Sequence, residues 1–303
     1  MAKSNTMYVW LMVTWLLCVA WFIPRFASLW RTLDSSLLQT LLVFVLFCLA
    51  IFWFYGIHFY AFFLFTHLER RRKRLSRPPR RKPQPHPQVA ILYPTADDFE
   101  YRAALSCVNQ AYPSFHVFLL DDSSREEYHT RVDAFHHDFP EVTTVIRREN
   151  REGFKAGNLN NALAMVGCDH EFFAICDADN ILPTDFLTQL TPYLQEDSCL
   201  GFVQANHRIN GLQKESFVQD FHRLVDVGWD HHHLPRNRYG LAFCFGHGVV
   251  LRTEAWKQAG GFPLIVSEDI ALTLSMRRQG YFGRHVPEVI CGEGIPLTLR
   301  TWR

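Results

Sequence analysis

The sequence predicts an α/β protein, in which two membrane-spanning helices precede a mostly parallel sheet with helices on both faces. Three observations predict this fold. From Gln88 onward, short apolar runs alternate with helical patterns, as in parallel sheets whose crossover connections are helices. Two long apolar runs without formal charge come before that region. Aspartates follow three of the predicted strands, at the edge where such sheets bind their ligands.

The two apolar runs extend from Met7 to Ile23 and from Leu37 to Thr66. A membrane-spanning helix needs about 20 apolar residues, so we expect helices over about 7–23 and 37–66, within a membrane region at 1–67. A signal peptide is the alternative for the first run. The bulky ending Trp21-Phe22-Ile23 and the missing small-x-small cleavage site argue against it.

A basic segment follows the second run, with nine Lys and Arg residues between Arg70 and Lys82. Because such flanks are cytoplasmic, we expect the amino terminus and everything after residue 67 to lie in the cytoplasm. Nucleic-acid binding is the usual alternative for a basic segment. Residues 83–303, however, carry nine more acidic than basic residues, which argues against a nucleic-acid partner. We therefore expect the basic segment to contact the anionic lipid bilayer. The prolines among residues 68–87 are expected to make this segment a stiff linker.

Strand and helix patterns alternate from the first predicted strand, which begins at Val89, to the fourth, which ends at Cys176. We expect strands over 89–93, 116–120, 143–147 and 171–176, and helices over 101–109, 126–139, 156–165 and 270–278, with a further helix starting near Pro183. The eight cysteines have no zinc-ligand spacing and are expected to be reduced thiols. His231-His-His233 is interpreted as a polar loop, because no second group of metal ligands is evident nearby.

Asp177-Ala-Asp179 follows directly after the fourth predicted strand. Two carboxylates at such a position suit a hard cation, Mg²⁺ or Mn²⁺, which usually shares its oxygen ligands with substrate phosphates. The alternative is a turn whose aspartates cap the following helix. The sequence thus predicts a site for a metal and a nucleotide diphosphate at this edge.

Six stretches in order resemble the family 2 glycosyltransferases, in particular the membrane-embedded processive branch that includes cellulose, curdlan, hyaluronan and chitin synthases. They cover most of residues 88–290. The stretches are Tyr93-Pro-Thr-Ala-Asp-Asp98, Leu119-Leu-Asp-Asp-Ser123, Phe154-Lys-Ala-Gly-Asn-Leu-Asn-Asn161, Cys176-Asp-Ala-Asp-Asn180, Phe243-Cys-Phe-Gly-His-Gly248 and Ser267-Glu-Asp269. Each is weak alone, but together they imply a GT-A fold for residues 88–303.

The resemblance implies a donor site for a UDP-sugar. Thr95, Asp98 and Asp122 correspond to positions that hold the base and ribose. Lys155 corresponds to a cation near the diphosphate, and its alternative is a solvated lysine. Gly157-Asn158 is expected to let the backbone approach the donor closely.

The resemblance also implies the catalytic groups. Asp177 and Asp179 would ligate the metal that neutralises the UDP leaving group. Asp269 corresponds to the catalytic base, and a single displacement would give a β-linked product from an α-linked donor. A helix N-terminus is the alternative for Glu268-Asp269, and both can hold.

Gly246, His247 and Glu268 are expected to line the acceptor pocket, and Gln204 to His207 to contact the glycan.

UDP-glucose is the donor and a growing glycan the acceptor by resemblance, with accessory membrane or periplasmic subunits as further partners. The same resemblance implies a bacterial inner (plasma) membrane location with a cytoplasmic catalytic domain. The Gln-(Gln/Arg)-x-Arg-Trp motif of processive members is not reproduced by Arg300 and Trp302, so we expect the domain to be incomplete at its carboxyl end. An inactive nucleotide-sugar-binding module and a non-processive transferase to a lipid-linked acceptor are the alternatives.

Overall fold

The computed structural model describes residues 6–72, 86–167, 169–209, 223, 225–233, 236–237 and 240–294. The chain divides into two compact units, residues 1–74 and residues 75–303. Most of the basic linker, parts of 210–239 and the carboxyl end with Arg300 and Trp302 lie outside the described residues. The polar loop expected at His231-His-His233 is wrong, because these residues belong to a π-helix, η1 (Gly228–His233).

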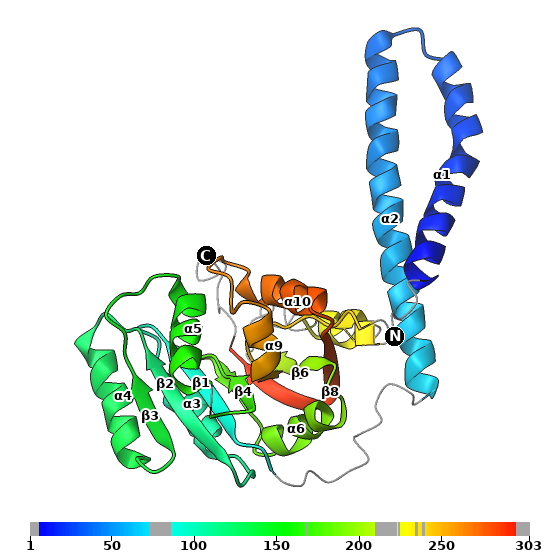
Figure 1. Ribbon diagram of the computed structural model, residues 1–303. Coiled ribbons are helices and arrows are strands. Elements are labelled where there is room, and N and C mark those ends of the chain that lie inside the picture. Colours follow the sequence, from blue (N-terminus) through cyan, green and yellow to red (C-terminus); the bar gives the residue numbers. More distant parts are fainter. Residues whose placement is uncertain are drawn as a thin grey trace. The chain divides into compact units, whose positions relative to one another are not determined.

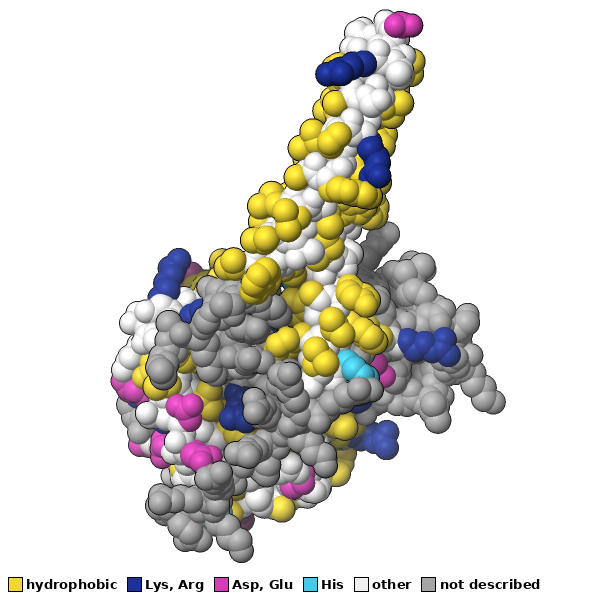
Figure 2. All heavy atoms as spheres, turned by 90° about the vertical axis from the view of Figure 1, so that its right-hand side faces the viewer, with side chains coloured by type: hydrophobic (Ala, Val, Ile, Leu, Met, Phe, Trp, Pro, Cys, Tyr) yellow, Lys and Arg dark blue, Asp and Glu magenta, His cyan; other side chains and the backbone are white. Residues whose placement is uncertain are grey.

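The first unit is a pair of helices, α1 (Thr6–Arg31) and α2 (Ser36–Arg72), that lie side by side (Figure 1). Trp15 Nε1 donates a hydrogen bond to the Ala50 carbonyl at 2.8 Å, and the Phe22 and Trp53 rings meet edge to face at 5.0 Å. Apolar side chains cover the outside of the pair (Figure 2). Tyr8–Arg31 and Ser36–Leu68 are long and apolar enough to cross a membrane.

Both helices extend beyond the predicted apolar runs. Helix α1 continues through Pro24 to Arg31, although a proline removes one helical hydrogen bond. The guanidinium of Arg25, two residues beyond the apolar run, lies over the Trp21 ring, 3.9 Å from its centroid, and this cation–π contact shields its charge.

The second unit contains an eight-stranded sheet with the order β3-β2-β1-β4-β7-β6-β8-β5. The strands are β1 (Val89–Thr95), β2 (Phe115–Asp121), β3 (Thr143–Ile146), β4 (Phe172–Ile175), β5 (Asn180–Ile181), β6 (Leu200–Ile209), β7 (Val249–Arg252) and β8 (Phe282–Glu293). Strands β1 to β4 pair in parallel, as the sequence predicts. Strand β7 runs antiparallel to both β4 and β6, and β5 antiparallel to β8, so the sheet is mixed.

Helices cover both faces of this sheet (Figure 1). One face packs against α3 (Tyr101–Val108), α4 (Glu126–Asp138) and α6 (Phe186–Glu196), and the other against α5 (Phe154–Val166), α9 (Thr253–Gln258) and α10 (Glu268–Arg278). Strand β1 supplies both cores, with Ile91 and Tyr93 on one side and Ala90 and Leu92 on the other. A strand buried on both faces explains why Val89 to Tyr93 is a continuous apolar run.

The parallel pairing determines where the acidic motifs lie. In the register, Thr95 is opposite Asp121, and Leu92 is opposite Ile175, two residues before Asp177. Because β1, β2 and β4 are neighbours that run in one direction, their carboxyl ends meet at one edge of the sheet.

Candidate active site

A cleft of about 570 Å³ opens at this edge. All six residues predicted to hold the donor and its metal line it: Thr95, Asp98, Asp122, Lys155, Asp177 and Asp179. The other lining residues are Pro94, Ala96, Glu100, Arg151, Phe154, Asn158 and Ala178. The structure thus brings these side chains together, while their individual roles remain predictions.

The two aspartates after β1 differ in their contacts. Asp98 Oδ1 accepts hydrogen bonds from Thr95 Oγ1 at 2.8 Å and from the Ala96 amide at 2.7 Å, which fixes its carboxylate at the cleft. Asp97 has a left-handed backbone (φ 66°), and its carboxylate accepts bonds from the Ser124 hydroxyl and the Ser124 and Arg125 amides. The Ser124 hydroxyl, with these amides, lowers the pKa of Asp97 to about 2. Asp97 therefore joins the ends of β1 and β2.

Asp122 is held by an arginine that the motif analysis missed. Arg148 Nε lies 2.9 Å from Oδ1, and Nη2 lies 2.5 Å from Oδ2. Its side chain also donates to the carbonyls of Glu152 and Phe154. The pair is nearly buried, with 9% and 6% of the two side chains exposed. The neighbouring Asp121 is bound through Oδ2 by Arg147 Nε at 2.8 Å and by His129 Nδ1 at 2.6 Å.

Lys155 lies in the first turn of α5 and connects two of the predicted motifs. Its Nζ donates to Asp177 Oδ2 at 2.6 Å and to the Gly246 carbonyl at 3.2 Å. Burial alone would lower the pKa of Lys155, but the adjacent Asp177 carboxylate raises it above the ordinary value. The ammonium is therefore charged at neutral pH and faces the cleft.

The carboxylates of Asp177 and Asp179 fit a hard divalent cation. Asp177 Oδ1 is buried and has no hydrogen-bond partner among the residues that the structure describes, so it is available as a ligand. Partial desolvation in the cleft and the Asp177 carboxylate raise the pKa of Asp179. Bringing a cation between them would relieve this repulsion, and oxygen ligands of this kind suit Mg²⁺ and Mn²⁺.

Gly246 separates the donor cleft from the predicted base. A Cβ at Gly246 would lie 3.5 Å from Lys155 Nζ and 3.6 Å from Asp269 Oδ2, and the residue has φ 74°. Asp269 and Glu268 begin helix α10, whose first turn they make acidic. Burial raises the pKa of Glu268, and nearby Lys155 opposes that rise. The Cys244 amide and Thr273 Oγ1 tie this helix to the segment before Gly246 (3.0 Å).

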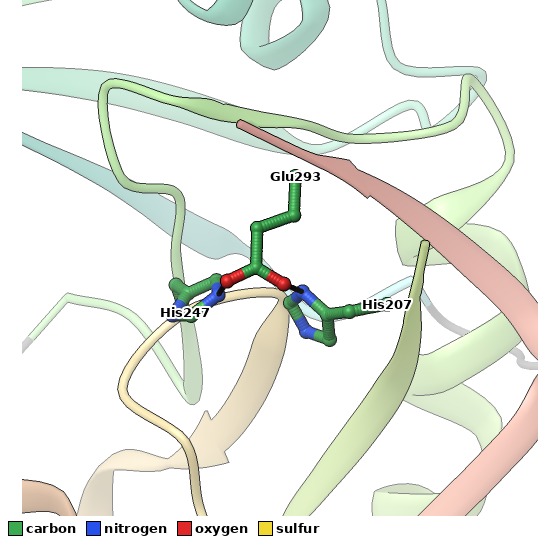
Figure 3. A group of neighbouring side chains, drawn as sticks. All are labelled: His207, His247 and Glu293. Atoms are coloured by element: carbon green, nitrogen blue, oxygen red, sulfur yellow. Dashed lines mark ion pairs between the residues drawn. The ribbon is translucent and has the colours of Figure 1, made fainter. Parts of the chain in front are cut away.

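His247 belongs to a cluster that the motifs did not predict. Its Nδ1 lies 3.6 Å from Asp177 Oδ2, and its Nε2 lies 3.6 Å from Glu293 Oε1. The other oxygen of Glu293 lies 3.8 Å from His207 Nδ1, so the carboxylate sits between the two rings (Figure 3). Burial lowers the pKa of His207 well below its ordinary value. For His247 burial acts in the same direction, but Glu293 and Asp177 raise its pKa.

Gly157 has a packing role: a Cβ there would lie 1.9 Å from the Glu152 carbonyl oxygen and 2.7 Å from Arg148 Nη1, so this glycine lets helix α5 pack against the 148–152 segment. Asn158 lines the cleft, and the close approach of the donor to Gly157-Asn158 stays a prediction. The expectation for Gln204 to His207 was wrong. Gln204 and His207 are 1% and 0% exposed within β6 and cannot contact a glycan at the surface. Gln204 instead binds the His247 and Gly248 carbonyls and the Phe245 amide.

Comparisons with known proteins decide the family. The sequence model of the family described as "Glycosyltransferase like family 2" matches residues 87–300. The chain belongs to this family. The resemblance stated from the motifs and the α/β fold are thereby confirmed.

Curated relatives are similar over most of the second unit. A glucomannan 4-beta-mannosyltransferase 1 from Cyamopsis tetragonoloba is 30% identical over 232 residues, which are 72% of this chain and 43% of that protein. A putative cellulose synthase 2 from Komagataeibacter xylinus is 29% identical over 229 residues, 67% of this chain and 14% of that protein. The chain thus spans less than half the length of these relatives.

Among solved structures, a mannosyltransferase from Pyrobaculum calidifontis in complex with GDP-Man and Mn²⁺ has the same fold. It matches with a TM-score of 0.59 and 24% identity, over 79% of this chain and 67% of that one.

Proposed function

We propose that this family member is an inverting hexosyltransferase. It transfers glucose from UDP-glucose to a growing β-linked polysaccharide at a membrane. The observation that carries the proposal is the contact chain at Gly246. Lys155 binds both Asp177 and the Gly246 carbonyl, and Asp269 lies next to that glycine. The predicted diphosphate site and the predicted base therefore border one small residue.

The donor occupies the cleft with its nucleotide toward Thr95, Asp98 and Asp122. Asp98 is fixed by the Thr95 hydroxyl and the Ala96 amide, so its second oxygen is oriented without cost at binding. Arg148 donates to both oxygens of Asp122 and fixes that carboxylate as well. A uracil N–H is a suitable donor to either carboxylate.

The diphosphate lies against Lys155, Asp177 and Asp179. Lys155 remains protonated at neutral pH and turns from Asp177 toward the phosphate oxygens when the donor binds. A divalent cation held by the two aspartates supplies charge stabilisation for the departing UDP. Asp177 Oδ1, buried and unpartnered within the described residues, is the oxygen best prepared to hold it.

Asp269 accepts the proton from the acceptor hydroxyl as that oxygen attacks the anomeric carbon. One displacement breaks the bond to UDP and forms the new glycosidic bond, which inverts the anomeric configuration. The Asp269 carboxylate lies in the first turn of α10, where the helix dipole favours negative charge. Because residue 246 is a glycine, it places no side chain against Lys155 and Asp269.

Transfer assays test the proposal. Membranes containing the full chain are supplied with labelled UDP-glucose or GDP-mannose and Mn²⁺ or Mg²⁺, and product is digested with a β-glucanase. We expect incorporation from UDP-glucose into material that the enzyme degrades. Donor binding without transfer or hydrolysis would contradict the proposal and favour a binding module, and incorporation only from GDP-mannose would contradict the donor.

We also propose that α1 and α2 cross a bacterial plasma membrane, with the second unit in the cytoplasm. The apolar surface of the helices and the nine cations after Glu69 support this. Carbonate extraction should leave the chain in the membrane, and protease should reach the second unit in inverted vesicles. Release by carbonate, or protection in those vesicles, would overturn it.

A further inference from the structure

We propose that His207, His247 and Glu293 form a second cation site, which takes a divalent transition metal. The three ligating atoms all lie within 4.8 Å of one another. They come from β6, from the loop before β7 and from the end of β8. The site shares no ligand with the predicted Asp177 and Asp179 site, which it adjoins at His247, and it does not depend on glycosyl transfer.

The spacing of the side chains suits metal ligands better than hydrogen bonds. The His247–Glu293 and Glu293–His207 distances are 3.6 and 3.8 Å, longer than the usual limit of about 3.2 Å for a hydrogen bond. Ligands about 2.0–2.2 Å from one ion are separated by up to about 4 Å. His247 Nε2, moreover, is buried and has no hydrogen-bond partner in the described part of the chain. This nitrogen is therefore available as a metal ligand.

The ring of His207 is fixed by its surroundings. It stacks on Trp229, with the ring centroids 4.7 Å apart and the ring planes at 23° to each other. Gln204 Nε2, which donates to the His247 carbonyl at 2.9 Å, lies 3.1 Å from His207 Nε2. Nε2 therefore faces Gln204 and Nδ1 faces Glu293, and a contact at the second ring nitrogen orients a metal-binding imidazole.

Two further residues complete the surroundings of His207. Asn180 Nδ2 lies 3.4 Å from Nδ1 but donates a better bond to the Gly292 carbonyl at 3.1 Å, which it keeps when a cation binds. Gly248 has φ 56°, and a Cβ there would lie 2.6 Å from the His207 ring. The backbone is thus shaped to admit this imidazole.

Strand pairing places the third ligand. In the parallel β6–β8 pair, His207 is opposite Cys291 and Ile209 is opposite Glu293. His207 and Glu293 are therefore diagonal neighbours on adjacent strands, within reach of long side chains. Ligands on strands are held more rigidly than ligands on loops.

Two imidazoles and one carboxylate favour a transition metal such as Zn²⁺, Co²⁺ or Mn²⁺ over Mg²⁺, which prefers oxygen ligands. The Asp177 and Asp179 pair has the opposite preference. The two sites touch at His247, whose Nδ1 lies 3.6 Å from Asp177 Oδ2. A cation bound through Nε2 would fix the His247 ring beside the donor cleft.

Co²⁺ binding without nucleotide tests the site. The full chain in detergent is freed of metal with EDTA, then titrated with Co²⁺ in excess Mg²⁺, and binding is measured by equilibrium dialysis and visible absorption. We expect His207→Gln and Glu293→Gln to weaken this binding by at least about 10–100-fold, the loss typical of an outer contact alone. The double variant Asp177→Asn/Asp179→Asn should retain it.

His137→Gln, a change of an exposed histidine on α4, controls for binding to other histidines. Circular dichroism and the melting temperature confirm that each variant is folded. Unchanged Co²⁺ affinity and spectrum in folded Glu293→Gln would overturn the proposal. Loss of all Co²⁺ binding in the double aspartate variant would also overturn it, since the histidines would then serve the aspartate site.

Discussion

Arg148 and Asp122 form a bidentate ion pair at the carboxyl ends of β2 and β3, with N–O distances of 2.9 and 2.5 Å. Both side chains are nearly buried. The arginine also binds the Glu152 and Phe154 carbonyls, so it connects the nucleotide side of the cleft to the start of α5 and thereby to Lys155. Arg148 thus positions two of the residues that we predict to bind the sugar donor, Asp122 and Lys155.

Removing this arginine should destabilise the second unit strongly. Arg148→Ala leaves the Asp122 carboxylate buried without its partner, which typically costs about 3–5 kcal/mol of unfolding free energy. Arg131→Ala is the matched control, because its pair with Glu127 is exposed and is worth about 0–1 kcal/mol. Denaturant unfolding of the purified chain measures both. Equal, small losses for the two variants would show that the buried pair does not hold the cleft.

Gly157→Ala should also lower the stability, although alanine is the better helix former by about 1 kcal/mol. The added Cβ would collide with the Glu152 carbonyl at 1.9 Å, and overpacking of this kind costs about 1–3 kcal/mol. Gly56→Ala in α2 is the control, because no atom lies within 4 Å of the position that a Cβ at residue 56 would take. A melting temperature of Gly157→Ala at or above the wild-type value would contradict the packing role.

Asp97 should make stability depend on acid pH. Its pKa of about 2 is below the ordinary 3.8, so its contribution is complete above about pH 4 and is lost as the pH falls toward 2. Asp97→Asn keeps the left-handed backbone, removes the charge and replaces one of the two acceptor oxygens. The variant should melt below the wild type at pH 6, and the difference should shrink as the pH decreases from 4. A difference independent of pH would refute the assignment.

Asp177→Asn/Asp179→Asn should abolish the dependence of UDP binding on Mn²⁺ or Mg²⁺. Without the two negative charges the cation has too few anionic ligands, and we expect UDP affinity to fall by about 100-fold or more. Calorimetry with and without EDTA measures it, with the exposed Asp138→Asn as control. Equal wild-type affinity for UDP in EDTA would show that the aspartates do not hold a nucleotide-bound cation.

The sequence predicted most of the parallel half of the sheet, because strands buried on both faces are continuous apolar runs. It also placed the strand-end acids, since β1, β2 and β4 were each recognisable from such runs. The antiparallel β7 was not predicted, because Val249–Arg252 is only four residues long and its direction depends on pairing with distant β4 and β6.

The arginine pairs could have been found. Leu120 is opposite Ile146 in the parallel β2–β3 pair, so one more residue along both strands places Asp121 beside Arg147, and the next places Asp122 beside Arg148. The His207, His247 and Glu293 cluster could not, because it joins three segments whose proximity requires the β6–β8 register and the turn at Gly248.

The most direct test of the account compares wild type with Asp269→Asn in sugar transfer from the UDP donor and in UDP-sugar affinity. If Asp269 is the base, its proton transfer matters only in the transition state. Transfer should then fall by about 10²–10⁴-fold, while UDP-sugar affinity stays within about twofold and Asp138→Asn changes neither. An Asp269→Asn variant that transfers sugar at the wild-type rate would contradict the account.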